Sequence, residues 1–118
     1  MKKILIIKHG SLGDIIFSLP VMHTINQHYK NEQIQILTQK KYFEFFKLSN
    51  YFNNLIEDNR SGNILTTIKI LFNILKNNYD LIIDLQNSSR TSYYNLFFRV
   101  FSSAKICSSR PLSHFRYN

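Results

Sequence analysis

An aspartate, a serine and two glycines share a short turn near the start of the chain, where they could bind or activate a polar ligand. The turn belongs to the run Lys8-His9-Gly10-Ser11-Leu12-Gly13-Asp14. Its glycines permit unusual backbone angles and let a ligand approach the main chain. The amides that follow begin a predicted helix, where unpaired N–H groups and the helix dipole stabilise an anion. The G-x-x-G spacing matches neither a dinucleotide fingerprint nor a Walker loop, because an aspartate follows the second glycine.

Asp14 has two interpretations at this stage. A carboxylate in the first turn of a helix commonly caps that helix. A carboxylate in a ligand crevice can instead act as a general base towards a sugar hydroxyl within hydrogen-bond distance. The residues of the turn are compatible with both.

The turn is positioned by apolar runs that alternate with helical patterns. Strands are predicted over 3–8, 33–38, 54–57, 79–86 and 104–107, and helices over 14–29, 41–48, 64–76 and 88–101. Pro20 should kink the first helix or split it near Ser18-Leu19. The apolar face of helix 64–76 comprises Ile64, Leu65, Ile68, Leu71, Phe72 and Leu75, and that of helix 88–101 comprises Leu96, Phe97, Val100 and Phe101.

This alternation predicts an α/β domain with a Rossmann-like parallel sheet and helices on both faces. Ligands of such sheets bind at the carboxyl ends of the strands. The rule selects four loops, which should share one rim: His9–Asp14, Thr38–Lys40, Asp58–Ser61 and Asp84–Arg90.

The charge balance and the cysteine content limit which ligands, partners and cellular compartment we expect for this protein. The chain has 15 Lys and Arg against 7 Asp and Glu, a net charge of +8, which favours phosphorylated ligands, acidic membranes or nucleic acid, although solvated positive faces explain it equally. The single cysteine, Cys107, excludes an internal disulfide and a cysteine-built metal site. The apolar run Ile4–Ile7 is too short for a signal peptide or a membrane span and is expected to be a buried strand in a cytoplasmic protein.

Two stretches carry a resemblance to a known family. Ile6-Ile7-Lys8-His9-Gly10-Ser11-Leu12-Gly13-Asp14-Ile15-Ile16-Phe17-Ser18-Leu19-Pro20 resembles the opening of glycosyltransferase family 9, the lipopolysaccharide heptosyltransferases, with its lysine, S-x-G-D turn and later L-P. Tyr79-Asp80-Leu81-Ile82-Ile83-Asp84-Leu85-Gln86 is similar to the family's second signature strand, in the same order and at a similar separation. The resemblance also accounts for Pro20.

The resemblance implies the N-terminal half of a two-domain GT-B glycosyltransferase, which holds a phosphorylated lipopolysaccharide core acceptor. Transfer would be inverting, with Asp14 as the catalytic base and with Lys8, Ser11 and Gly13 at the acceptor. The donor is a nucleotide sugar, ADP-heptose, which is a substrate, so no cofactor and no metal are expected. A peripheral contact with the inner membrane is compatible with the basic charge, and the aromatic run Tyr93–Arg99 is either part of that contact or a buried helix face.

The sequence departs from the family at several positions. His9 replaces the usual Thr or Ser and is expected to be a solvated turn histidine, and Phe17 stands where a histidine is common. Arg60 and Arg90 follow the third and fourth predicted strands, so each is either a ligand for acceptor phosphate or a surface arginine.

The resemblance covers only about the first third of a typical family member. We therefore expect residues 1–107 to form an acceptor-side domain that is itself incomplete, residues 108–118 to be an irregular tail, and the C-terminal donor-binding domain to be absent. On this interpretation the isolated chain should not turn over alone. Two alternatives stay open, a truncated non-catalytic remnant and a basic α/β module that binds nucleotide or RNA. The second leaves both signatures unexplained, and the basic residues follow no RNA-binding pattern, so no nucleic acid is expected.

Overall fold

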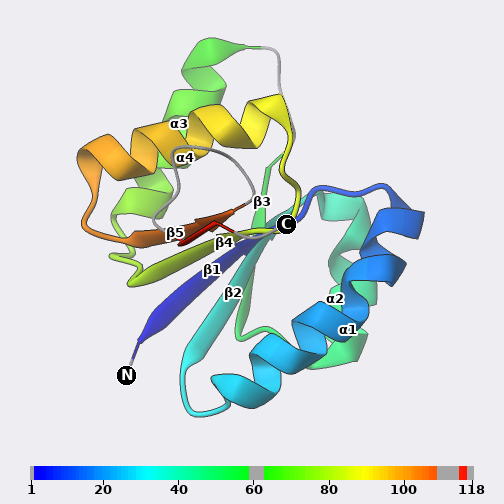
Figure 1. Ribbon diagram of the computed structural model, residues 1–118. Coiled ribbons are helices and arrows are strands. Elements are labelled where there is room, and N and C mark those ends of the chain that lie inside the picture. Colours follow the sequence, from blue (N-terminus) through cyan, green and yellow to red (C-terminus); the bar gives the residue numbers. More distant parts are fainter. Residues whose placement is uncertain (1, 59–62, 109–114, 117–118) are drawn as a thin grey trace.

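The computed structural model describes residues 2–58, 63–108 and 115–116. These residues form a six-stranded parallel sheet with the strand order β3-β2-β1-β4-β5-β6 (Figure 1). The strands are β1 (Lys3–Ile7), β2 (Gln33–Thr38), β3 (Asn54–Glu57), β4 (Leu81–Asp84), β5 (Lys105–Ser108) and β6 (Phe115–Arg116). The helices are α1 (Leu12–His28), α2 (Phe43–Ser49), α3 (Ile64–Leu75) and α4 (Ser89–Phe101), with a 3-10 turn η1 (Lys40–Tyr42) before α2. The predicted Rossmann-like α/β fold is confirmed.

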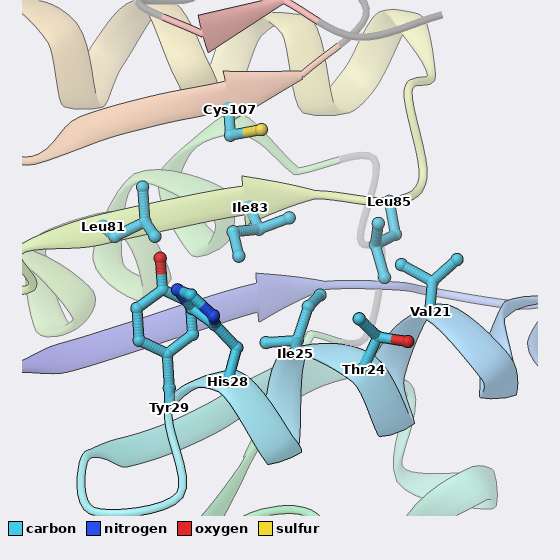
Figure 2. Close-up of a pocket in the computed structure, with 9 residues that line it drawn as sticks. All are labelled: Val21, Thr24, Ile25, His28, Tyr29, Leu81, Ile83, Leu85 and Cys107. Atoms are coloured by element: carbon cyan, nitrogen blue, oxygen red, sulfur yellow. The ribbon is translucent and has the colours of Figure 1, made fainter.

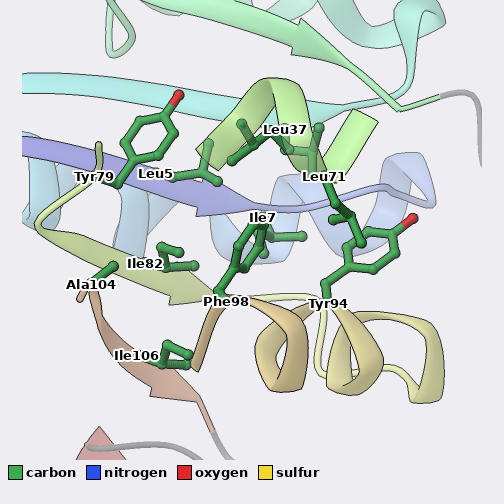
Figure 3. Close-up of a cluster of buried hydrophobic side chains, with 11 residues drawn as sticks. Leu5, Ile7, Leu37, Leu71, Tyr79, Ile82, Tyr94, Phe98, Ala104 and Ile106 are labelled. Atoms are coloured by element: carbon green, nitrogen blue, oxygen red, sulfur yellow. The ribbon is translucent and has the colours of Figure 1, made fainter. Parts of the chain in front are cut away.

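Alternation along β1 divides the core between the two faces of the sheet. Ile4 and Ile6 pack with residues of α1 and α2 on one face, whereas Leu5 and Ile7 pack with residues of α3 and α4 on the other. Figure 3 shows this second cluster, in which Tyr94 and Phe98 of α4 lie over the strands. Because helices cover both faces of the central strands, those strands are apolar at consecutive positions.

The helix α1 continues through Pro20, so the expected split near Ser18-Leu19 is wrong. Proline removes one backbone N–H and crowds the preceding turn, which disfavours it inside a helix. Here Ile15 and Met22, on either side of the proline, are both buried against the sheet. This packing against the sheet keeps the residues before and after Pro20 in one continuous helix.

The predicted core face of α4 is wrong, because the helix is rotated about its axis relative to the prediction. Leu96, Val100 and Phe101 are 41%, 64% and 62% exposed. The buried positions are instead Thr91, Tyr94, Asn95 and Phe98. Hydrogen bonds fix this rotation, because the side chain of Asn95 donates to buried Asp84 (2.9 Å) and the hydroxyl of Tyr94 donates to buried Asp58 (2.6 Å).

Two further expectations change in part. Helix α3 buries Leu71 and Ile74, but Ile64 and Leu65 of its predicted apolar face are exposed in its first turn, and Phe72 is about half exposed. The irregular tail over 108–118 is wrong where the structure describes it, since Ser108 ends β5 and Phe115–Arg116 forms β6. Backbone pairing between Cys107 and Phe115 adds this short strand to the edge of the sheet.

Candidate functional site

The carboxyl ends of the first four strands meet at one edge of the sheet. Ile7 pairs with Leu37 on one side and with Asp84 on the other, and Thr38 pairs with Glu57. The loops after β1, β2, β3 and β4 therefore share a rim, as the sequence predicts, for the residues that the structure describes. Arg60 lies outside the described residues.

Asp14 occupies the third position of α1 with its side chain exposed to solvent. The N-cap residue Ser11 donates to Oδ2 of Asp14 from its backbone N–H (3.3 Å) and from its hydroxyl (3.4 Å). Oδ1 makes no hydrogen bond within the described part of the chain. The capping interpretation is thus confirmed, and it leaves one carboxylate oxygen open to a ligand.

Neighbouring loops clamp the turn that carries Asp14. The backbone N–H of His9 donates to the side chain of Gln86 after β4 (3.0 Å), and its carbonyl accepts from the side chain of Gln39 after β2 (2.6 Å). Gly10 has a φ of 130°, and a Cβ there would lie 2.7 Å from Cε2 of Tyr42. The conformation and the space at this position both require glycine.

The three other predicted acceptor residues of this turn differ in accessibility. Lys8 is only 7% exposed, and its Nζ donates to the carbonyl of Leu85 (3.2 Å). Ser11 and Gly13 are exposed, and a Cβ on Gly13 would meet no atom within 4 Å. A ligand can therefore reach the backbone of the first helical turn, whereas the Lys8 ammonium is directed to the loop after β4.

His9 is fully buried, so the expectation of a solvated histidine is wrong. Its Nε2 lies 2.8 Å from Oδ2 of Asp58, which is itself fully buried at the end of β3. The contact is close, but it lacks the alignment of a hydrogen bond, and Nδ1 has no partner among the described residues. The ring also packs edge-on against Tyr94. The physical reason for the burial is this acidic and aromatic pocket, which no local sequence pattern around His9 reveals.

Arg90 belongs to the same cluster and is not an ordinary surface arginine. Its Nε donates to the hydroxyl of Tyr94 (2.6 Å), and its Nη2 donates to Thr67 of α3 (3.1 Å). The same Nη2 lies 3.8 Å from Oδ1 of Asp58. Burial, and then the hydrogen bond to Asp58, raise the pKa of the Tyr94 hydroxyl. The side chain of Arg90 keeps a quarter of its surface exposed.

Asp84, by contrast, has a structural role. Its Oδ1 accepts the backbone N–H groups of Gln86 and Asn87 (both 2.9 Å), and its Oδ2 accepts from Asn95. These bonds hold the turn after β4 and the start of α4. The sequence selected the rim loops that begin at Asp58 and Asp84, but it did not single out Asp58 as a site residue, and Tyr94 was missed. The only signal for Asp58 is its position directly after a strand.

No protein-family model matches the sequence, and no curated protein matches it. Solved structures do match. The crystal structure of a glycosyl transferase family 9 protein from Veillonella parvula superposes on 99% of this chain with a TM-score of 0.83. The chain has the glycosyltransferase family 9 fold. Sequence identity to that protein is 18%.

Two structures of the heptosyltransferase WaaC from E. coli share the fold. The structure with ADP covers 89% of this chain at a TM-score of 0.64, and the structure with ADP-2-deoxy-2-fluoro heptose covers 89% at 0.70, each at 17% identity. The chain spans about a third of each of these glycosyltransferases, which is 36% of the Veillonella protein and 33% and 35% of the WaaC chains.

A groove of about 530 Å³ opens beside α1 and reaches the rim at Leu85, which directly follows β4. Figure 2 shows α1 facing β4 and β5 across it. Its walls are almost wholly apolar, and they are formed by Val21, Thr24, Ile25, His28, Tyr29, Leu81, Ile83, Leu85 and Cys107. None of the described residues that line it carries a carboxylate or an ammonium group.

The described residues contain no group of three His, Cys, Asp or Glu side chains placed to hold a metal ion. Within the same residues no helix has the length and apolar character to span a membrane.

Proposed function

We propose that this chain is the acceptor-side part of an inverting glycosyltransferase with the GT-B architecture. It would act like an ADP-heptose:lipopolysaccharide heptosyltransferase and transfer a sugar from a nucleotide donor to a phosphorylated lipopolysaccharide core. One observation carries the proposal. The open carboxylate oxygen of Asp14 stands on a clamped turn at the carboxyl edge of a sheet with the family 9 fold.

Asp14 would be the general base. Its carboxylate takes the proton of the acceptor hydroxyl, while the hydroxyl oxygen forms a bond to the anomeric carbon of the donor. The bond between that carbon and the diphosphate breaks, and the diphosphate leaves with the electron pair. Ser11 restrains the carboxylate through Oδ2, which leaves Oδ1 as the oxygen that receives the proton.

The acceptor phosphates would be bound by the basic and amide groups of the rim. Ser11 and Gly13 offer the exposed N-terminus of α1 to an anion, and buried Lys8 adds positive potential to the same rim. Arg90, whose side chain keeps a quarter of its surface exposed, lines a hollow of about 200 Å³ with Thr67 and Tyr94, and it would bind a phosphate there. Arg60 completes the proposed acceptor set.

The donor would bind to a part of the enzyme outside this chain. The WaaC structures contain ADP and an ADP-heptose analogue, and about two thirds of each WaaC chain lies outside the matched region. We propose ADP-heptose as the donor substrate, with no cofactor or metal, and a cytoplasmic enzyme in peripheral contact with the inner membrane.

Two measurements test the proposal. Titration of the ¹⁵N-labelled chain with a phosphorylated core saccharide should shift the amide signals of Ser11 and Gly13. A chimera in which this chain replaces the matched third of the Veillonella protein should transfer sugar, and Asp14→Asn should lower its kcat by about 10²–10⁴-fold. Glu44→Gln, an exposed acid on α2, is the matched control and should leave kcat unchanged.

Different outcomes separate the parts of the proposal. Wild-type transfer by the Asp14→Asn chimera would contradict the base assignment. If Lys8→Ala reduced kcat and left KM unchanged, Lys8 would not have the proposed acceptor-binding role. Absence of any shift at Ser11 and Gly13 at millimolar saccharide would contradict the acceptor site itself.

A further inference from the structure

The outer surface of α3 and α4 is apolar where a solvated helix pair should be polar. We define the aromatic face as Phe72, Tyr93, Leu96, Phe97, Val100 and Phe101. Five of these six side chains are more than 40% exposed. On α4 the spacing from Tyr93 to Phe101 is helical, so the exposed stripe occupies one side of the helix, while polar Thr91 and Asn95 are buried on the other side.

The aromatic face is continuous across both helices. The ring of Phe97 packs edge-on against Phe72 of α3, with 5.3 Å between ring centroids, and in a tilted arrangement against Phe101 of its own helix, at 4.9 Å. Figure 1 shows α3 and α4 on the same side of the sheet. Apolar patches that span two elements mark contact surfaces more often than scattered apolar residues do.

The charged residues within the two helices are all basic, and the exposed carboxylate of Asp80 lies beyond them, beside Lys105. Neither α3 nor α4 contains an aspartate or a glutamate. Exposed Lys69 and Arg99 lie within the two helices, and exposed Lys76 and Lys105 follow their carboxyl ends. The face therefore combines exposed rings with a rim of cations.

We propose that the aromatic face lies on an anionic membrane surface. Amphipathic helices that rest in a membrane interface carry aromatic and aliphatic side chains on one side and basic residues at its edge. Anionic headgroups would pair with the cations, and the rings would enter the boundary of the acyl chains. The net charge of +8 adds to the attraction.

Charge also argues against a second copy of the chain as the occupant. In a two-fold dimer the same patch meets itself. Lys69 and Arg99 of one copy would then face those of the other, and the two helices offer no carboxylate to pair with them. Lipid headgroups supply negative charge that α3 and α4 of a second copy would not.

This inference deepens the peripheral membrane contact of the proposed function, on which it rests for its biological setting. Lipid binding itself requires neither donor nor acceptor. The two proposals therefore fail separately. If the chain does not bind vesicles but the chimera transfers sugar, only the membrane face is refuted. If the chain binds vesicles but the chimera does not transfer sugar, only the enzyme proposal is refuted.

The test is sedimentation of the 118-residue chain with vesicles. One set of vesicles contains phosphatidylcholine alone, and the other contains phosphatidylcholine and phosphatidylglycerol in equal parts. We expect binding to the anionic vesicles that weakens as salt is added. Removing one cation, as in Lys69→Gln or Arg99→Gln, should weaken the partition coefficient by about fivefold.

The apolar contribution is tested with the pair Val100→Ser and Phe101→Ser in one variant, which should weaken binding by about tenfold or more. Leu48→Ser is the matched control, because Leu48 is 84% exposed but lies on α2, across the sheet. Circular dichroism checks that each variant keeps the fold. Since these side chains are exposed, folding should be retained.

Three results would overturn the proposal. Equal binding to both kinds of vesicle would remove the role of charge. An equal loss in the Leu48→Ser control would remove the role of this face. A dimer in light scattering that the Val100→Ser, Phe101→Ser variant abolishes would assign the face to a second copy.

Discussion

Buried His9 and Asp58, which follow β1 and β3, allow the most direct test of which contacts stabilise the site. Replacing Asp58 by asparagine keeps the shape of the side chain and removes its charge. The carboxylate is fully buried, and it contacts Nε2 of His9 at 2.8 Å, the hydroxyl of Tyr94 at 2.6 Å and the guanidinium of Arg90 at 3.8 Å. Because removing one partner leaves the others buried without compensation, Asp58→Asn should cost about 3 kcal/mol of unfolding free energy.

Urea unfolding followed by circular dichroism measures this cost. With a slope of about 1.5 kcal/mol per molar urea, the midpoint should fall by about 2 M at unchanged slope. His9→Ala should also destabilise the chain, and the double variant should lose less than the sum of the single losses, since both remove the same contact. Glu44→Gln on α2, whose partner Lys47 lies 3.4 Å away in solvent, serves as the control with no measurable change.

The result that refutes this reasoning is an unchanged midpoint. If Asp58→Asn unfolded at the urea concentration of the Glu44→Gln control, the buried cluster would contribute nothing to stability. Additive losses in the double variant would instead mean that His9 and Asp58 act independently.

Three further predictions follow from single groups. Gly10→Ala should destabilise the chain by about 2 kcal/mol or more in urea unfolding, because of its φ of 130° and the nearby Tyr42 ring, whereas Gly13→Ala, in open helical space, should not destabilise it. Burial raises the pKa values of Tyr79 and Tyr94 above their ordinary value of 10.0, so the unfolded chain loses these protons first. The stability that they contribute is complete below pH 10.0 and falls above it by about 1.4 kcal/mol per pH unit for each tyrosine, and urea midpoints of Tyr79→Phe and Tyr94→Phe should fall less steeply in that range. Burial raises the pKa of the Cys107 thiol, so its reaction with a thiol reagent at pH 8 should be slower than that of a free cysteine, and an apolar ligand in the groove beside α1 should slow it further.

Local patterns in the sequence were sufficient for the first five strands but not for β6. Gln33–Thr38 and Asn54–Glu57 are observed as predicted, and the first strand ends one residue earlier, at Ile7. The same patterns placed Asp14 where the turn after the first strand meets the first helix, although the helix begins two residues earlier, at Leu12. Such features depend on residues that are neighbours in the sequence, so they can be predicted from a single sequence.

The rotation of α4 and the burial of His9 could not be predicted in this way. Hydrophobicity alone places Leu96 and Val100 inside, but hydrogen bonds from Tyr94 to Asp58 and from Asn95 to Asp84 turn the helix the other way. His9 is buried because β3 brings Asp58 beside it. Both outcomes depend on polar partners that meet only after the sheet has formed.

The open groove between α1 and the strands β4 and β5 has a consequence for calorimetry and dye assays. Leu81, Ile83 and Leu85 line apolar space that the folded chain leaves in contact with solvent. Unfolding then uncovers less new apolar surface, and its heat-capacity change should lie below the roughly 12–15 cal/mol/K per residue of fully covered domains. The free energy of unfolding should accordingly vary less with temperature. An apolar fluorescent dye that enters this groove will bind the native state. A bright signal from this chain is therefore not evidence of a partly unfolded state.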